Sequence, residues 1–236
     1  MEAPPPSEPP EPDKMRRLAS GLAHELRNPL NSAKLQLDAL LRTEAHRLSS
    51  QTQERVAAAL QELARVSDLI DDYLSLVTPR GLQTRPTVLH QTVAEAVAVV
   101  CRELSHAPSI AVEVEARLPL VEADERRVTQ ILVHLLRNSV EATANARPRR
   151  IAISASAEST MVKVTVRDNG HGFSEEVRAR AFEPFVTTKT NGTGLGLTLV
   201  REAVAAHGGA VTLNVGHEST VVGFTLPQWL PPDSGA

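Results

Sequence analysis

Two stretches of this chain decide how the rest is interpreted: FEPFVTTKTNGTGLGL at residues 182–197 and HELRNPL at residues 24–30. In the first, Gly192, Gly194 and Gly196 can bring the backbone close to a phosphate and direct N–H groups at it. A helix following the last glycine would add its positive N-terminal end. The pattern is neither a Walker loop nor a Rossmann fingerprint. By itself it leaves nucleotide binding undecided.

Length and composition limit the class of protein. With 236 residues, of which 42% are hydrophobic, the chain can hold one or two globular domains. A net charge of −3 gives no general attraction to nucleic acid or anionic membrane. The single Cys101 cannot form an internal disulfide, which fits a reducing compartment. No apolar run approaches the roughly 18–20 residues that span a bilayer. We therefore expect a cytoplasmic chain, or the cytoplasmic part of a larger receptor.

The N-terminal third consists of a leader and two expected helices. Residues 1–13 contain six prolines and four acidic residues, which predicts a disordered leader without an apolar face. Apolar residues then recur at spacings of three and four over 14–43 and over 51–78, which predicts helices. The short link 44–50 makes them an antiparallel hairpin, forming a domain over residues 14–80. Because one hairpin buries little surface, we expect two copies to pair into a four-helix bundle in a homodimer.

From residue 85 onward the pattern changes to mixed helix and strand. Alternating apolar residues predict strands, and apolar residues at helical spacing predict helices. The expected strands are 110–116, 151–157, 161–167, 210–215 and 220–226, and the expected helices are 89–104, 124–144 and 196–206. Successive strands lie too close together for crossover connections. We therefore predict an α+β chain in which residues 85–230 form a two-layer α/β sandwich, followed by a tail at 231–236.

The segment DNGHGF at 168–173 follows an expected strand. A carboxylate at the strand end, Asp168, could accept a hydrogen bond from an adenine amino group, and the glycines would leave room for a flat base. A simple Asp-Asn-Gly turn is the alternative for this segment. Phe182 and Phe185 precede the glycine-rich loop, where they could anchor a mobile lid or belong to the ordinary core.

A polar amide, Asn138, lies on the expected helix 124–144 beside Leu135 and Leu136. A polar group on such a face needs a partner. That partner could be a metal ion that bridges phosphates or, alternatively, a backbone cap.

These segments together resemble the catalytic core of a two-component sensor histidine kinase. The similar segments, in the family's order, are LAHELRNPL, ILVHLLRNSVEA, DNGHGF, FEPFVTTK and GTGLGL. They span residues 14–226, and their wording is closest to the nitrogen-regulation-like subgroup. The resemblance implies a dimerisation hairpin that carries the phosphoacceptor, followed by an ATPase domain of the type shared with gyrase and Hsp90.

For the hairpin, the resemblance implies that His24 is phosphorylated on a ring nitrogen. It implies that Glu25 holds or deprotonates the imidazole, and that Asn28, one helical turn away, positions a water for a phosphatase activity toward the regulator. Pro29 cannot donate to the carbonyl of Glu25, so we expect a kink there. On the helical pattern Leu22 lies on the apolar stripe, as does Leu26, and His24 projects away from them toward solvent.

For the second domain, the resemblance implies that ATP and Mg²⁺ are bound, with Asn138 holding the metal and Asp168 reading adenine. Residues 174–191 would form a lid. Further nucleotide contacts would come from Gly170, Gly172, Phe182, Phe185, Lys189, Gly192, Thr193, Gly194, Leu195 and Gly196. The phosphoryl group would then pass to an aspartate on the receiver domain of a response regulator.

One position departs from the family's pattern: His134 stands where many members carry a second asparagine, which puts metal or phosphate affinity in doubt. ATPases of the gyrase, Hsp90 or MutL type place a water-activating glutamate there and lack the HELRNP hairpin. Serine kinases that act on anti-sigma factors also lack this hairpin. The alternatives to a histidine kinase are therefore another ATPase or kinase of the superfold, or an inactive dimerisation scaffold.

Overall fold

The computed structural model describes residues 12–77, 81–103, 108–189, 192–216 and 219–231. The chain divides into two compact units, Met1–Arg80 and Gly81–Ala236. The first unit holds the two long helices, and the second holds the mixed helices and strands. Of the predicted leader 1–13, residues 1–11 lie outside the described residues, whereas Pro12 and Asp13 belong to a helix; residues 232–236 of the predicted tail also lie outside the described residues.

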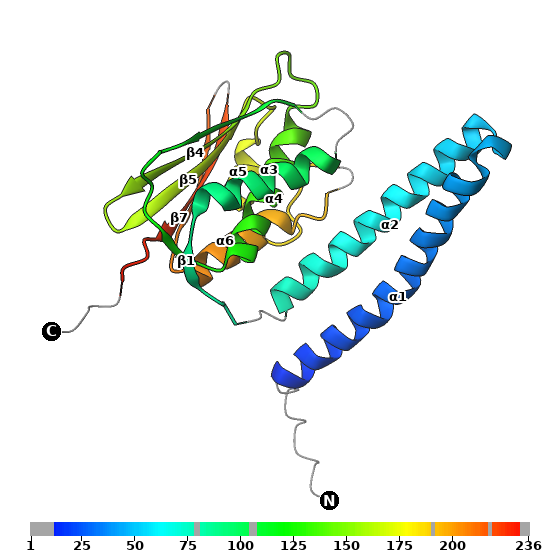
Figure 1. Cartoon of the computed structure of the whole chain (residues 1–236), viewed down its shortest axis with the longest axis horizontal. Helices are drawn as coiled ribbons and strands as arrows, with labels where there is room; N and C mark the ends of the chain where they lie inside the picture. Colours follow the sequence, from blue (N-terminus) through cyan, green and yellow to red (C-terminus); the bar gives the residue numbers. More distant parts are fainter. Residues whose placement is uncertain (1–11, 78–80, 104–107, 190–191, 217–218, 232–236) are drawn as a thin grey trace, which may run out of the picture. The chain divides into compact units, whose positions relative to one another are not determined.

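The first unit is a hairpin of two long helices (Figure 1). Helix α1 spans Pro12–Glu44, a short 3₁₀ turn covers Ala45–Arg47, and helix α2 spans Ser50–Val77. Gln53 closes the turn, because its Nε2 donates to the carbonyl oxygen of Ala45 at 2.7 Å. The predicted hairpin is thus confirmed. Pro29 lies inside an uninterrupted α1, so the expected kink stays a prediction.

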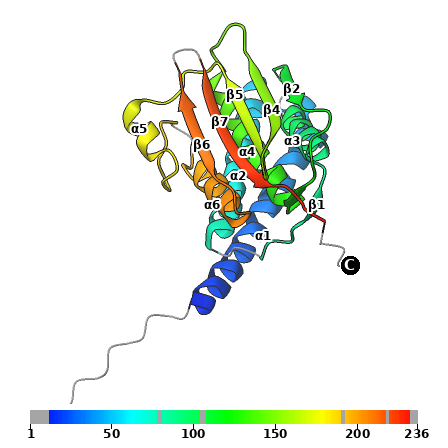
Figure 2. The same cartoon turned by 90° about the vertical axis from the view of Figure 1, so that its left-hand side faces the viewer.

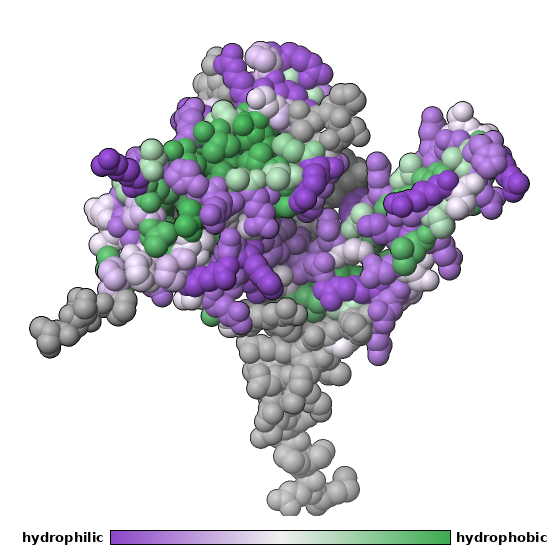
Figure 3. Space-filling view, in the orientation of Figure 1, coloured by the Kyte–Doolittle hydropathy of each residue, from purple (hydrophilic) through white to green (hydrophobic). Residues whose placement is uncertain are grey.

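The hairpin leaves several large apolar side chains in contact with solvent. Leu22 is 59% exposed and Leu26 is 44% exposed, so neither lies in a core formed by one protomer alone. Figure 3 shows hydrophobic patches among hydrophilic residues on the hairpin surface. The other exposed apolar side chains of the hairpin are Leu35, Val66 and Tyr73. Such a surface has the apolar side chains that pairing with a second hairpin would bury.

The second unit is built on a mixed five-stranded sheet of order β2-β4-β5-β7-β6 (Figure 2). Its strands are β2 (Ile110–Val114), β4 (Ile151–Glu158), β5 (Met161–Asp168), β6 (Val211–Val215) and β7 (Thr220–Pro227). Strands β2 and β4 are parallel, and the other neighbours are antiparallel. The alternation in β4 and β5 places every second residue in the core, as predicted.

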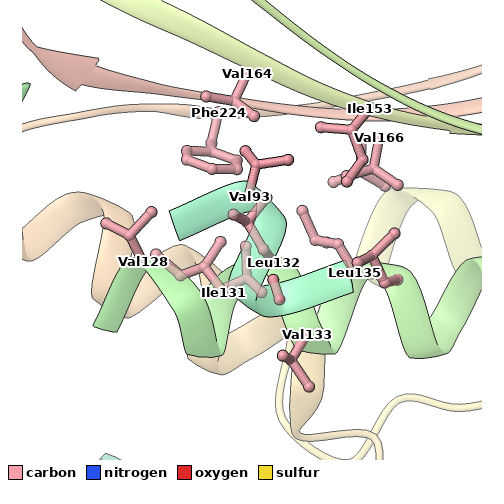
Figure 4. Close-up of a cluster of buried hydrophobic side chains, with 14 of the residues drawn as sticks. Val93, Val128, Ile131, Leu132, Val133, Leu135, Ile153, Val164, Val166 and Phe224 are labelled. Atoms are coloured by element: carbon pink, nitrogen blue, oxygen red, sulfur yellow. The ribbon is translucent and has the colours of Figure 1, made fainter. Parts of the chain in front are cut away.

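Three helices, α3 (Leu89–Glu103), α4 (Glu125–Ala142) and α6 (Gly196–Ala206), form the second layer. Figure 4 shows side chains from α3, α4 and the sheet meeting in one apolar cluster. The labelled members are Val93, Val128, Ile131, Leu132, Val133, Leu135, Ile153, Val164, Val166 and Phe224. The two-layer sandwich is therefore confirmed, and its core is aliphatic because the chain has few aromatic residues.

The start of α4 is fixed by two contacts. The side chain of Asp124 accepts a hydrogen bond from the Arg127 N–H at 3.3 Å and so caps the helix. The buried His207 connects the backbone of Asp124 to the end of α6. Its Nε2 accepts a hydrogen bond from the Asp124 N–H at 3.0 Å. Its Nδ1 lies 2.7 Å from the Ala203 carbonyl oxygen. Helices α4 and α6 are thereby held together at this end.

Sequence patterns missed three short elements. Strands β1 (Arg85–Thr87) and β3 (Val121–Ala123) pair antiparallel, and helix α5 (Glu175–Arg180) lies within the expected lid. Strands of three residues are too short to show alternation. Helix α5 is preceded by Ser174, a residue type that is common at helix N-caps. The Ser174 hydroxyl accepts a hydrogen bond from the Val177 N–H.

Candidate functional site

The end of strand β5 holds a buried carboxylate, Asp168, whose side chain is 5% exposed. Its Oδ2 accepts a hydrogen bond from the Ser139 hydroxyl at 2.8 Å, and its Oδ1 accepts one from the Gly170 N–H at 2.9 Å. Burial raises the pKa of Asp168 above its ordinary value, and the hydrogen bonds from Gly170 and Ser139 oppose that shift. A carboxylate has about four acceptor positions, so this one can take a further donor such as an adenine amino group.

Glycines after Asp168 let this segment pack closely against neighbouring elements. A Cβ atom on Gly170 would lie only 2.6–2.7 Å from atoms of Ala142, so no side chain fits there. Gly172 has φ +67°, a conformation that L side chains rarely adopt. Asn169 fixes the same segment, because its Oδ1 accepts from the Arg150 N–H and its Nδ2 donates to the Pro148 carbonyl oxygen, both at 2.8 Å. The DNGHGF segment is thus a locked turn that also presents a carboxylate.

The glycine-rich loop has the close backbone packing that its sequence implies. Gly194 has φ +68°, and a Cβ there would lie 2.5 Å from the backbone of Phe185. The Phe185 N–H donates to the Gly194 carbonyl oxygen at 3.0 Å. Thr193 supports the next turn, since its Oγ1 accepts from the Leu195 N–H at 3.1 Å. Helix α6 begins at Gly196, and its N-cap, Leu195, has no side chain that could occupy the first N–H groups.

An amide and two charged groups meet at the far end of α4. Lys189 Nζ donates to Asn138 Oδ1 at 2.8 Å and lies 2.5 Å from Glu141 Oε2. Asn138 is therefore bound by a cation through the oxygen that a metal would use. The alternative partner, a backbone cap, does not appear among the described hydrogen bonds of Asn138. An amide and a carboxylate oxygen suit Mg²⁺, which prefers oxygen ligands together with phosphate oxygens.

His134 lies on α4 one turn before Asn138, and its Nδ1 is 3.6 Å from the position that a Cβ on Gly196 would take. It lines a small cleft between α4 and α6 together with Arg127, Gln130, Ile131, Leu199, Val200 and Ala203. Burial, together with the nearby Arg137, lowers the pKa of His134 to about 4. The ring is therefore neutral at physiological pH. It adds no charge beside the phosphate loop.

The two phenylalanines of the lid differ in their surroundings. Phe182 is half-buried against the core, and its carbonyl oxygen accepts from the Thr198 hydroxyl at 3.0 Å. Phe185 is 69% exposed and has φ +65°, an uncommon conformation for a residue other than glycine. Phe182 thus anchors the segment by packing against the core, which is the second of the two roles considered for it. Phe185 lies outside the core.

The HELRNPL segment lies in the other unit, on helix α1. Glu25 and Asn28 are exposed, and their spacing places Asn28 one turn from His24. The backbone of His24 belongs to α1, but its side chain lies outside the described part of the structure, so its exposure stays a prediction. The neighbouring Arg27 pairs across the hairpin with Asp71, and its Nε lies 2.9 Å from Asp71 Oδ1.

Two family descriptions match this chain. Residues 14–81 match the His Kinase A (phospho-acceptor) domain. Residues 123–230 match the histidine kinase-, DNA gyrase B-, and HSP90-like ATPase. The chain belongs to the sensor histidine kinase family. Both matches agree with the two units of the structure, and no helix among the described residues is long and apolar enough to cross a membrane.

Individual relatives of this kinase family give the same result. The sensor histidine kinase ZraS of Escherichia coli O157:H7 is 32% identical over 221 residues, which cover 91% of this chain and 45% of ZraS. The sensory histidine kinase/phosphatase NtrB of Rhizobium meliloti is 29% identical, covering 89% of this chain and 58% of NtrB. The chain thus spans about half the length of these relatives. The crystal structure of full-length ShkA in complex with AMPPNP matches with a TM-score of 0.72 and 28% identity, covering 90% of this chain and 46% of ShkA.

Sequence reasoning missed two residues of the site, Ser139 and Glu141. Ser139 follows the recognised Asn138 and turns inward to hold the carboxylate of Asp168. Glu141 lies three positions after Asn138, which places the two on one helix face beside Lys189. The helical spacing alone would have placed Glu141 beside Asn138. No sequence signal points to its ion pair with Lys189, which comes from a loop some fifty positions away.

Proposed function

We propose that the chain is an ATP-dependent protein-histidine kinase of a two-component system, in which His24 is the phosphoacceptor. The observation that carries the proposal is the buried Asp168, whose carboxylate is held by Ser139 and Gly170 and has acceptor positions left for a further donor. Family membership adds the phosphoacceptor hairpin. The remaining assignments to individual residues are part of this proposal.

The nucleotide contacts follow the geometry of the second unit. Asp168 accepts the hydrogen bond of the adenine amino group, and the backbone between Gly192 and Gly196 faces the phosphates with the N-terminus of α6. Asn138 holds Mg²⁺, which neutralises phosphate charge when it is bound. Lys189 and the segment 174–191 form the lid, and Phe185, Thr193 and Leu195 belong to it or to the phosphate loop.

The chemical step is a phosphoryl transfer. A ring nitrogen of His24 attacks the γ-phosphorus, a nitrogen–phosphorus bond forms, the bond to the β,γ-bridging oxygen breaks, and ADP leaves. Glu25 orients the imidazole or accepts its proton, and positioning supplies most of the rate. The phosphoryl group then passes to an aspartate of a receiver domain. Asn28, exposed one turn from His24, would orient the water that hydrolyses that aspartyl phosphate.

The hairpin supports a homodimer. Leu22 and Leu26 are exposed in one protomer, and a second copy of the hairpin would bury them in a four-helix bundle. The partner that receives the phosphoryl group is a response regulator docked on the same hairpin.

The competing function, ATP hydrolysis of the gyrase type, fits the site less well. Those enzymes use a glutamate as general base at the position of His134. Here that position holds the neutral, buried His134, so the carboxylate base of those enzymes is absent. The HELRNPL helix would also have no role in such an ATPase.

The test is incubation of the purified chain with γ-labelled ATP and Mg²⁺, beside its His24→Gln variant. We expect acid-labile, alkali-stable label on the wild type and none on the variant, because phosphohistidine hydrolyses in acid. His90→Asn, at an exposed position on α3, is the matched control and should label normally. Label that persists in the His24 variant, or binding of ATP without any label, would contradict the proposal.

A further inference from the structure

The ammonium of Lys189 already bridges two oxygens of α4. It lies 2.8 Å from Asn138 Oδ1 and 2.5 Å from Glu141 Oε2. Because Asn138 and Glu141 are three residues apart, both face the same side of the helix. In this arrangement a cation therefore occupies the amide oxygen that the proposed function assigns to Mg²⁺. Two cations at that one oxygen would repel each other, so binding of one disfavours binding of the other.

The bridge is weak enough to be exchanged. The side chain of Lys189 is 36% exposed and that of Glu141 is 58% exposed. Ion pairs at this exposure contribute about 0–1 kcal/mol, because solvent and salt screen them. The lysine stem has four rotatable carbons, so its ammonium can leave without movement of the backbone. Nothing here resembles a buried ion pair, whose disruption would cost several kcal/mol.

The loop keeps Lys189 close to the site in either state. The Lys189 N–H donates to Thr187 Oγ1 at 3.1 Å, and the Lys189 carbonyl oxygen accepts from the Gly192 N–H at 3.2 Å. A Cβ on Gly192 would lie 2.4 Å from Thr187 Oγ1, so the turn is closed around this residue. The backbone of Lys189 is thus tethered beside the phosphate loop, while its side chain is free to change partners.

We propose that Lys189 is an exchangeable internal cation. Without nucleotide its ammonium bridges Asn138 and Glu141, and the divalent cation that accompanies ATP replaces it at Asn138. The displaced ammonium then turns to the phosphate oxygens. Glu141 is a positioning residue for Lys189 in the nucleotide-free state and does not hold the metal. The inference rests on the proposed function, and it predicts that the bridge competes with Mg·ATP.

Competition between the Lys189 bridge and Mg·ATP predicts whether substitution of Glu141 strengthens or weakens nucleotide binding. A ligand binds with lower apparent affinity when only a fraction of the protein is in the state that can bind it. Removing the carboxylate of Glu141 weakens the bridge, so Glu141→Gln should bind Mg·ATP more tightly than the wild type. If Glu141 were instead a metal ligand, the same substitution would weaken binding. The direction of the change therefore separates the two roles.

The experiment is calorimetric titration of the full chain with ATP in excess Mg²⁺ at low ionic strength. We expect Glu141→Gln to bind about two- to fivefold more tightly than wild type, and the difference to shrink at high salt. The matched control is Glu103→Gln, which removes another partly exposed carboxylate, one that lies 2.6 Å from Arg137. That control should bind ATP like the wild type.

A second readout follows the lid without nucleotide. Glu141→Gln and Lys189→Met should each raise the rate of proteolytic cleavage in residues 174–191, and the double variant should be cleaved no faster than either single variant. Unchanged or weaker Mg·ATP binding in Glu141→Gln, while His24 still labels, would overturn this inference alone. Absence of ATP binding in the wild type would overturn both this inference and the proposed function.

Discussion

The two units hold their site residues in opposite ways. In the second unit Asp168 is 5% exposed, with hydrogen bonds from Ser139 and Gly170 and glycine backbone packed against Ala142. On the hairpin, Glu25 and Asn28 are exposed. The carboxylate of Asp168 thus lies at an organised end of the second unit, where hydrogen bonds within that unit fix it. The hairpin instead presents Glu25 and Asn28 on an exposed helix surface.

The largest expected effect tests the organised end. Asp168→Asn should weaken ATP binding by about tenfold to a hundredfold, because a hydrogen bond to a charged acceptor contributes roughly 1.5–3 kcal/mol. It should not destabilise the fold, since burial already raises the pKa of Asp168 and so disfavours the charged form. Calorimetric titration and thermal unfolding at pH 7 measure the two quantities.

Ser154→Ala, which removes a hydroxyl that lies on the sheet 2.7 Å from Thr165, is the control for loss of a polar group in this unit. It should leave ATP affinity unchanged. Wild-type affinity in the Asp168 variant would show that adenine is read elsewhere. A large loss of stability would show that the carboxylate of Asp168 is chiefly structural. Either result would contradict the difference between the two units described above.

A smaller effect concerns His134, whose pKa falls from 6.5 to about 4 on folding. Between these values the unfolded chain binds more protons than the folded chain. The stability linked to this residue is therefore complete above pH 6.5 and is lost as pH falls toward 4. The loss is on the order of 2–3 kcal/mol. Urea unfolding of wild type and His134→Asn at pH 7, 5.5 and 4.5 measures it.

The His134 variant should lose less stability than wild type on acidification, whereas His90→Asn, at an exposed position, should follow the wild-type curve. Parallel curves for wild type and the His134 variant would mean that the ring is already solvated or protonated in the folded state. Water would then reach His134 between α4 and α6 more readily than the packing of these helices indicates.

The sequence predicted the elements whose signals are local or periodic. The hairpin and the two-layer sandwich follow from the spacing of apolar residues, and the structure confirms them. The family resemblance assigned the nucleotide contacts to Asp168 and the glycines, and this assignment stays a prediction. Contacts between distant segments were missed, because nothing in the sequence near Lys189 indicates that it pairs with Glu141. The same reason explains the exposure of Phe185, which depends on the backbone conformation that Gly194 imposes.

The smallest expected effect lies on the hairpin. Asp71→Asn removes the carboxylate partner of Arg27, but the two side chains are 53% and 38% exposed. An ion pair at that exposure contributes about 0–1 kcal/mol, so the melting temperature of the full chain should fall by only a few degrees. The second quantity to measure is the labelling of His24, which lies three residues before Arg27 on the same helix. If Asp71→Asn slows labelling far more than it lowers the melting temperature, the pair orients the phosphoacceptor turn. If both change little, the exposed hairpin tolerates substitutions that the organised nucleotide site does not.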